Sequence, residues 1–186
     1  MSDRPASHRL LDADRWLLER MRTSGHRPAV ERSAAAYSKL GEHAAIWIGL
    51  GLAGGLVDPR PGARRLWLRG CSTVIAAYGL NFAVKLAVRR RRPELPDLPP
   101  LTSTVSRLSF PSAHATTSFA AAAAYRDLVP GGWLYAAAIA FALTRPYLGV
   151  HYPSDVVAGA ALGTALGTPV RRRGGAAAMA GGAGCR

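Results

Sequence analysis

Cysteine is scarce in this chain of 186 residues, which has only Cys71 and Cys185, and their spacing matches no metal or redox motif. A disulfide-stapled secreted module is therefore excluded, and we expect two free thiols. Acidic residues are also few, since 11 Asp and Glu stand against 24 Lys and Arg, for a formal net charge of +13. The chain is also not a disordered basic tail, because such tails have a low apolar content and 49% of these residues are hydrophobic.

The excess of basic residues indicates either nucleic acid or an anionic membrane as a partner, and the placement of the arginines favours the membrane. They cluster between long apolar stretches, at 60–69, 89–92 and 171–173. A nucleic-acid-binding domain of this size usually spreads its basic residues over one face. Arginines that flank apolar segments are typical anchors at a membrane interface. We therefore expect membrane lipids as partners and no nucleic acid.

The uncharged segments predict an all-α protein, an integral membrane bundle of about five transmembrane helices. The expected spans are 41–58, 66–88, 112–128, 132–149 and 154–171. In the last of these, three glycines four residues apart share one helical face, which favours close helix packing. They are Gly159, Gly163 and Gly167. The alternative is a soluble bundle with alanine-rich buried helices.

The chain outside the spans divides into flanking regions. Residues 1–37 are expected to form an N-terminal segment with an amphipathic helix on the membrane, and they lack the apolar core of a signal peptide. Residues 38–171 form the membrane domain, and 172–186 form a disordered basic tail rich in glycine and alanine. Prolines predict a loop at 94–109. The expected location is the cell membrane, as a multi-pass protein.

Polar residues gather at the ends of the spans, and alternation of the spans brings these ends to one side of the membrane. They are Lys85, Arg92, Ser112, His114, Arg145, His151 and Asp155. Three cations, Lys85, Arg92 and Arg145, would repel one another unless an anion neutralised them, and a phosphoryl group has several oxygens for this. Ser112 can cap the third span, which adds backbone N–H donors. The pattern predicts a phosphate site.

Two histidines and a carboxylate supply what cleavage of a phosphate ester needs. A neutral imidazole is a good nucleophile near pH 7, and a carboxylate at its other nitrogen fixes the tautomer. His151 and Asp155 suit that pair, and His114 can protonate the leaving oxygen. No Asp, Glu, His or Cys set has metal-ligand spacing, so we expect no metal and no other cofactor, with the cations offsetting transition-state charge.

Three motifs at these positions resemble the signatures of the type 2 phosphatidic acid phosphatase superfamily. In chain order they are Lys85-x6-Arg92-Pro93, Pro111-Ser112-Ala113-His114 and Thr144-Arg145-x5-His151-x3-Asp155. The second is Pro-Ser-Gly-His in the family, and the third begins with Ser-Arg. Any one of these motifs is a weak signal, whereas three in the correct order and spacing are specific. The resemblance covers roughly residues 38–170.

The resemblance implies a helical membrane phosphatase that is a metal-independent phosphoric monoester hydrolase acting on a phosphorylated lipid. Its third-signature histidine attacks phosphorus and forms a phosphohistidine, which water then hydrolyses. By position this nucleophile is His151, oriented by Asp155, with His114 as the acid for the leaving group. The phosphate-binding residues implied are Lys85, Arg92, Ser112, Ala113 and Arg145.

Departures from the family pattern leave every reacting group in place. Ala113 stands where the family has glycine, which keeps the backbone N–H but adds a methyl group near the phosphate. Thr144 replaces serine and retains a hydroxyl. We therefore expect an active enzyme. Many bacterial members carry six spans, and this chain is expected to lack the first.

The small size, Gly41-Glu42-His43 and the segment 110–116 resemble most closely an actinobacterial subgroup of this family. That subgroup is associated with removing the 5-phosphate from decaprenylphosphoryl phosphoribose, a precursor of cell-wall arabinan. Undecaprenyl diphosphate, phosphatidylglycerol phosphate and phosphatidate are alternative substrates. Outside the enzymes, the alternative is a membrane protein that binds anionic lipids without cleaving them. No oligomeric state is predicted.

Overall fold

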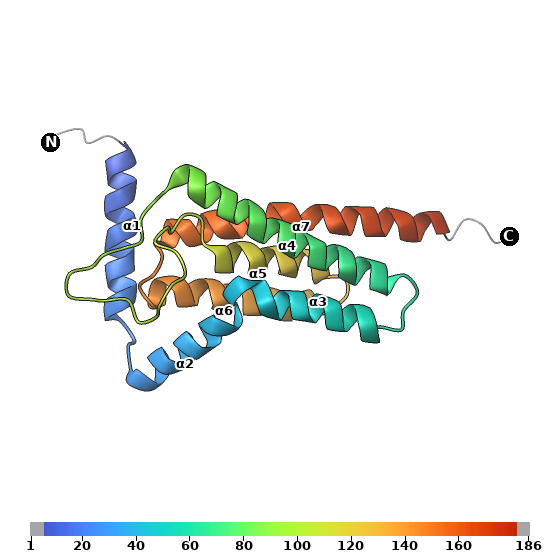
Figure 1. Ribbon diagram of the computed structural model, residues 1–186, viewed down its shortest axis with the longest axis horizontal. Coiled ribbons are helices and arrows are strands. Elements are labelled where there is room, and N and C mark those ends of the chain that lie inside the picture. The colour runs from blue at the N-terminus through green and yellow to red at the C-terminus, as the bar shows by residue number, and fades with distance from the viewer. Residues whose placement is uncertain (1–5, 182–186) are drawn as a thin grey trace.

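The computed structural model describes residues 6–181, with side chains from 10 to 168, and this part of the chain is all-helical. In order, the elements are α1 (Ala6–Thr23), α2 (Pro28–Leu40), the 3-10 helix η1 (Glu42–Ala44), α3 (Ala45–Val57), α4 (Ala63–Val88), α5 (Ala113–Tyr125), α6 (Gly131–Tyr147) and α7 (Pro153–Gly181). Helices α3 to α7 run along the long axis of the molecule, and α1 crosses one end of this bundle (Figure 1). The five predicted spans correspond to α3 through α7.

Helix α5 occupies the centre of the bundle because its side chains are small. Most of its residues are alanine, serine or threonine, and 11 of its 13 residues are buried. It packs against α4, α6 and α7. Ser112 caps its first turn, where the side-chain oxygen accepts the N–H of Ala115 at 3.5 Å. Asn81 of α4 donates its side-chain amide to Thr116 Oγ1 at 2.9 Å, which ties the two helices together.

Glycines of α7 allow its backbone to touch that of α5. A Cβ at Gly163 would lie 2.1 Å from the carbonyl oxygen of Thr116, and one at Gly159 would lie 2.6 Å from the carbonyl oxygen of Ser112. Both distances are far below van der Waals contact, so only glycine permits this approach. The predicted close packing along the face of Gly159, Gly163 and Gly167 is confirmed.

Large aromatic side chains fill the core of the bundle, and glycines make room for some of them. A Cβ at Gly54 would lie 2.4 Å from the ring of Trp67, and one at Gly70 would lie 2.2 Å from the ring of Tyr125. Phe141 of α6 joins the same buried cluster. Burying each such ring contributes on the order of 2–3 kcal/mol to the free energy of unfolding.

The helix predicted at 41–58 is broken at its start. His43 and Ala44 have φ angles of 53° and 59°, in the left-handed region, and regular helix begins only after them. Gly41 precedes the break, where a Cβ would lie 2.9 Å from the side chain of His114. A residue without a side chain is therefore required at the point where the chain turns past His114.

The C-terminal helix is longer than the sequence predicts. A disordered tail was expected over 172–186, but α7 continues to Gly181, so 172–181 are helical. The run of alanines at 176–178 favours helix. Residues 182–186 lie outside the described chain. The loop predicted at 94–109 is confirmed, since 89–112 contains no helix.

Helix length gives weaker support for membrane spans than the sequence does. Among the described residues, α4 alone is long and apolar enough to cross a membrane by itself, and α2 with η1 and α3 meets the same criterion as a pair bent by 47°. Helices α5 and α6 have 13 and 17 residues, or about 20 Å and 26 Å, whereas the hydrocarbon core is roughly 30 Å thick. This criterion supports one or two spans, not five.

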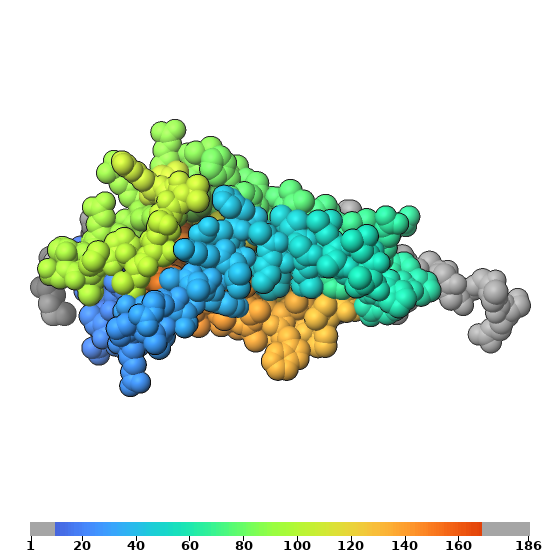
Figure 2. Space-filling model, turned by 60° about the horizontal axis from the view of Figure 1, so that its bottom comes forward, coloured from blue at the N-terminus to red at the C-terminus, as the bar shows by residue number. Residues whose placement is uncertain are grey.

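The loop 89–112 lies over the same end of the bundle as α1. In Figure 2 this loop, in yellow-green, meets α2 and the start of α3, in blue, across one face of the molecule. Arg22 of α1 is buried there and donates to the carbonyl oxygens of Pro99 at 2.7 Å and Tyr147 at 3.2 Å. The first helix, the loop and the end of α6 are thereby joined.

Candidate active site

Six of the eight predicted site residues line one cavity of about 110 Å³, where α4 and α6 end and α5 begins. They are Lys85, Arg92, Ala113, His114, Arg145 and His151. The other two lie directly behind this wall: Ser112 caps α5, and Asp155 stands in the first turn of α7 beside His151. Successive helices of the bundle run in opposite directions. The end of α4 with the loop after it, the start of α5, and the end of α6 with the turn after it therefore meet at one end of the bundle.

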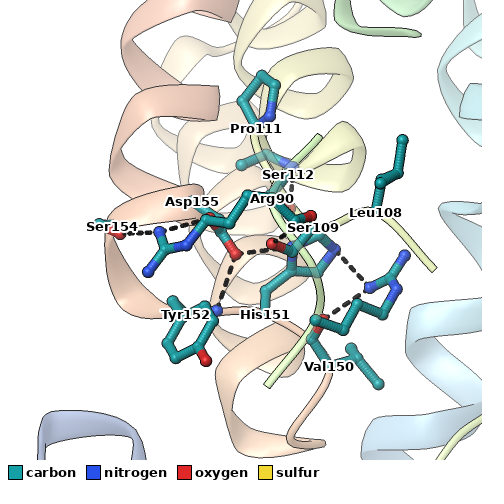
Figure 3. A network of polar contacts seen from close by, with 12 residues as sticks. Arg90, Leu108, Ser109, Pro111, Ser112, Val150, His151, Tyr152, Ser154 and Asp155 are labelled. Atoms are coloured by element: carbon teal, nitrogen blue, oxygen red, sulfur yellow. Dashed lines mark hydrogen bonds and ion pairs between the residues drawn. The ribbon is translucent and has the colours of Figure 1, made fainter. Parts of the chain in front are cut away.

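His151 lies in the turn between α6 and α7 and is only 2% exposed. Its Nε2 is 3.0 Å from Nη1 of Arg92. A guanidinium can only donate, so Nε2 holds the lone pair and the ring proton is on Nδ1. Nδ1 faces Oδ2 of Asp155 at 3.4 Å, within ion-pair distance but without an aligned hydrogen bond (Figure 3).

The surroundings of His151 keep its ring neutral. Burial holds the pKa of His151 well below its ordinary value, and the charges of Arg92, Arg145 and Lys85 lower it further. At pH 7 the imidazole therefore retains the lone pair that a nucleophile needs. Burial also lowers the pKa of Arg92 to about 10, which leaves this guanidinium protonated at pH 7.

Asp155 is fully buried, and each of its oxygens is occupied. Oδ2 accepts the N–H of Tyr152 at 2.9 Å, and Oδ1 accepts Nη1 of Arg90 at 2.9 Å. The backbone carbonyl oxygen of Asp155 accepts the N–H of Ser112 at 2.9 Å, which joins α7 to the start of α5. These contacts, several of them drawn in Figure 3, hold the carboxylate beside His151.

The cations of the cavity bind the loop through neutral acceptors. Lys85 Nζ donates to the carbonyl oxygens of Ser109 and Pro111 at 2.9 and 2.8 Å. Arg92 Nε donates to the carbonyl oxygen of Ser106 at 2.7 Å. Carbonyl oxygens carry no formal charge, so these contacts orient the cations without cancelling their charge. The cavity therefore attracts an anion.

Ser38, at the end of α2, connects two predicted residues and was not itself predicted. Its carbonyl oxygen accepts Nε2 of His114 at 2.9 Å, and its Oγ accepts a short hydrogen bond from Nη1 of Arg145. A carbonyl oxygen can only accept, so Nε2 of His114 carries a proton. The sequence offers no motif around Ser38, and only the packing of α2 against α6 reveals its contacts.

Arg90 and Asp14 were also missed as parts of the site. The sequence placed Arg90 with its neighbours as an interfacial anchor, but its side chain turns inward and binds Asp14, Ser154 and Asp155. No sequence motif links Asp14 to the three signatures.

The outer part of the cavity is lined by side chains that can bind hydroxyl groups. They are Glu42, His43, Tyr78, Ser103, Thr104 and Ser106. His43 Nδ1 and Tyr78 Oη are 3.0 Å apart and link η1 to α4. The aromatic ring of Phe82 completes this side of the cavity.

Fold and site together define a helical phosphatase: a neutral histidine, a buried carboxylate and three cations surround a cavity that attracts an anion. Residues 66–176 match the PAP2 superfamily, and the chain belongs to that family. The resemblance seen in the three signatures is thus confirmed, as is the prediction that the chain is a phosphoric monoester hydrolase.

The curated relatives extend over most of the chain. It is 45% identical over 135 residues to decaprenylphosphoryl-5-phosphoribose phosphatase of Mycolicibacterium smegmatis, which covers 72% of this chain and 73% of the relative. It is 40% identical over 149 residues to the protein of the same name from Mycobacterium tuberculosis, which covers 80% of this chain and 83% of the relative.

Solved structures agree on the fold. The transmembrane PAP2-type phosphatidylglycerolphosphate phosphatase of Bacillus subtilis superposes with a TM-score of 0.67 at 22% identity, covering 88% of this chain and 85% of the other. LpxE of Aquifex aeolicus superposes with a TM-score of 0.65 at 21% identity, covering 84% and 93%. At such identities the likeness concerns the fold alone.

Proposed function

We propose that this chain removes the 5-phosphate from decaprenylphosphoryl-5-phosphoribose. The observation that carries the proposal is the lone pair of His151 Nε2, held 3.0 Å from Arg92 Nη1 in a cavity that also contains Lys85 and Arg145. The substrate is the one named for the relatives at 45% and 40% identity.

In the first step His151 Nε2 attacks phosphorus, and the bond between phosphorus and the ribose 5-oxygen breaks. His114, in its imidazolium form and held through Nε2 by the carbonyl oxygen of Ser38, gives its Nδ1 proton to the ribose 5-oxygen, which leaves as an alcohol, and the phosphoryl group stays on His151. Asp155 stabilises the positive charge that this ring acquires. Water then attacks phosphorus and passes a proton to His114, which releases inorganic phosphate and restores the lone pair of His151.

The phosphate oxygens are bound by residues from three sides of the cavity. Lys85, Arg92 and Arg145 offset the charge that builds up on the oxygens in the transition state. Ser112 and Ala113 stand at the N-terminus of α5, where the helix dipole favours an anion.

The outer lining supports a sugar as the leaving group. Ribose hydroxyls need both donors and acceptors, and the pair of His43 and Tyr78 with the nearby carboxylate of Glu42 provides both. Phosphatidate has no free hydroxyl beside its phosphate and could not make hydrogen bonds to these groups. Phosphoribose could make them, so it is favoured over phosphatidate.

We also propose that the bundle is a multi-pass protein of the cell membrane, with α3 to α7 of residues 38–171 crossing the bilayer. Large apolar side chains on its outer faces support this, since a soluble surface rarely gathers so many. Among them are Leu52, Leu56, Leu68, Ile75, Phe82, Ile139 and Leu143. In residues 1–37, exposed Leu10, Leu11, Trp16 and Leu17 support a helix that lies on the membrane surface.

The experiment is phosphate release by the purified protein in detergent with EDTA. The panel contains decaprenylphosphoryl-5-phosphoribose, undecaprenyl diphosphate, phosphatidylglycerol phosphate and phosphatidate. His151→Ala tests the nucleophile, and His26→Gln, outside the cavity, is the matched control. We expect release from the phosphoribose lipid that is lost in His151→Ala and kept in His26→Gln.

The other outcomes separate the alternatives. Release from another lipid of the panel would support phosphatase activity but would assign it a different substrate. Binding of these lipids without release by the wild-type protein would favour an anionic-lipid-binding protein. Full activity in purified His151→Ala would refute the nucleophile.

A further inference from the structure

Asp14 of α1 is a carboxylate buried against the catalytic end of the bundle, with 8% of the residue exposed. Its Oδ2 accepts Nη2 of Arg90 at 2.7 Å, and its Oδ1 accepts the N–H of Ser154 at 2.9 Å. The hydroxyl of Ser154 also donates to Asp14. Asp14 therefore caps the first turn of α7, the turn that carries Asp155.

Arg90 connects this carboxylate to Asp155. One guanidinium nitrogen, Nη2, binds Asp14, and the other, Nη1, binds Oδ1 of Asp155 at 2.9 Å and Oγ of Ser154 at 2.7 Å. The guanidinium also stacks over the ring of Tyr152, 4.0 Å from its centre. Figure 3 shows Arg90 reaching Asp155 on the side of the carboxylate away from His151.

This arrangement decides which oxygen of Asp155 faces the nucleophile. Arg90 engages Oδ1, so Oδ2 is left to face Nδ1 of His151 at 3.4 Å. The charges matter as well. Arg90 alone would neutralise Asp155 and weaken its hold on a positively charged imidazole. Asp14 balances Arg90, so the three groups together keep one negative charge beside His151.

We propose that Asp14 and Arg90 are positioning residues of the phosphatase, which orient Asp155 and preserve its charge for the phosphohistidine step. The inference rests on the proposed role of His151 as the nucleophile. It gives α1 a part in catalysis, because the residue that completes the network comes from this helix and not from the three signatures.

The test compares Asp14→Asn, Arg90→Lys and the double variant with wild type in phosphate release from decaprenylphosphoryl-5-phosphoribose. We expect each single variant to lower kcat about tenfold, as loss of an outer partner does at metal sites, with KM within about twofold because no phosphate-binding cation is changed. The double variant should lose little more than either single one, since the two residues act through one contact. Asp14→Glu, which keeps the charge, should recover most of kcat.

Matched controls come from the same segments. Glu19→Gln removes an exposed α1 carboxylate paired with Arg15, and Arg91→Lys changes the exposed neighbour of Arg90. Both should keep wild-type kcat. Unchanged kcat in Asp14→Asn and Arg90→Lys, while His151→Ala is inactive, would overturn this inference alone. A fall in kcat matched by a fall in the folded fraction, without recovery in Asp14→Glu, would also overturn it. Activity in His151→Ala would instead overturn the proposed function.

Discussion

Nε2 of His151, which we propose as the nucleophile, must stay unprotonated to attack phosphorus, and burial of the ring among cations keeps it so. Because the pKa of His151 lies well below the ordinary value of about 6.5, the ring takes up a proton only in more acidic solution. In [15N]histidine spectra of the protein in detergent, the signal that disappears in His151→Ala should keep the pattern of a neutral ring from pH 8 down to pH 6. A signal that titrates near pH 6.5 would contradict this.

At the scale of residues, motif spacing predicted six side chains that line one cavity, but it did not predict the residues that hold them. Ser38 contacts His114 across 76 positions of sequence, and Asp14 contacts Arg90 across the same separation. Such contacts depend on how the helices pack against one another, and a local sequence motif does not predict this packing. Arg90 was interpreted as an interfacial anchor because it lies in a run of four consecutive arginines. In the structure it is Arg90 of this run whose side chain binds the buried carboxylates of Asp14 and Asp155.

At the scale of elements, the packing of α7 against α5 depends on glycines, which have no side chain to keep the two backbones apart. Gly163→Ala should lower Tm, because its methyl group would meet the backbone of Thr116 at 2.1 Å and force the helices apart. Overpacking of this kind costs about 1–3 kcal/mol. Gly79→Ala in α4 is the control: its methyl group would meet nothing within 4 Å, so Tm should stay the same or rise slightly. Equal thermal stability of the two variants would contradict the proposed role of this contact.

Uncharged runs predicted the positions of α3 to α7, and the four-residue glycine spacing predicted which face of α7 is packed. Two features escaped this approach. Helix α2 mixes polar and apolar residues, so no uncharged run marks it. The break at His43 and Ala44 arises because the chain must pass His114 at Gly41, a contact that depends on the assembled bundle.

For the molecule as a whole, a multi-pass topology places the two ends of the bundle on opposite faces of the membrane. In a chain without its native cysteines, Val105→Cys would mark the end that carries the site, and Pro61→Cys and Pro130→Cys would mark the other; all three positions are exposed. We expect a membrane-impermeant maleimide, applied to intact cells, to label Val105→Cys differently from the other two. Labelling of all three from the same side would contradict spans at α4 and α5.

The contact of Asp14 with Ser154 also has a consequence for biosynthesis. Its two partners lie 140 residues apart, and a ribosome adds about 5–20 residues per second. The contact between the first helix and the last therefore forms only after a delay on the order of 10 s, when the start of α7 has been made. Assembly of the site is consequently a late event. A chain whose synthesis stops before α7 lacks Asp155, so we expect it to have no phosphatase activity while it is being inserted into the membrane.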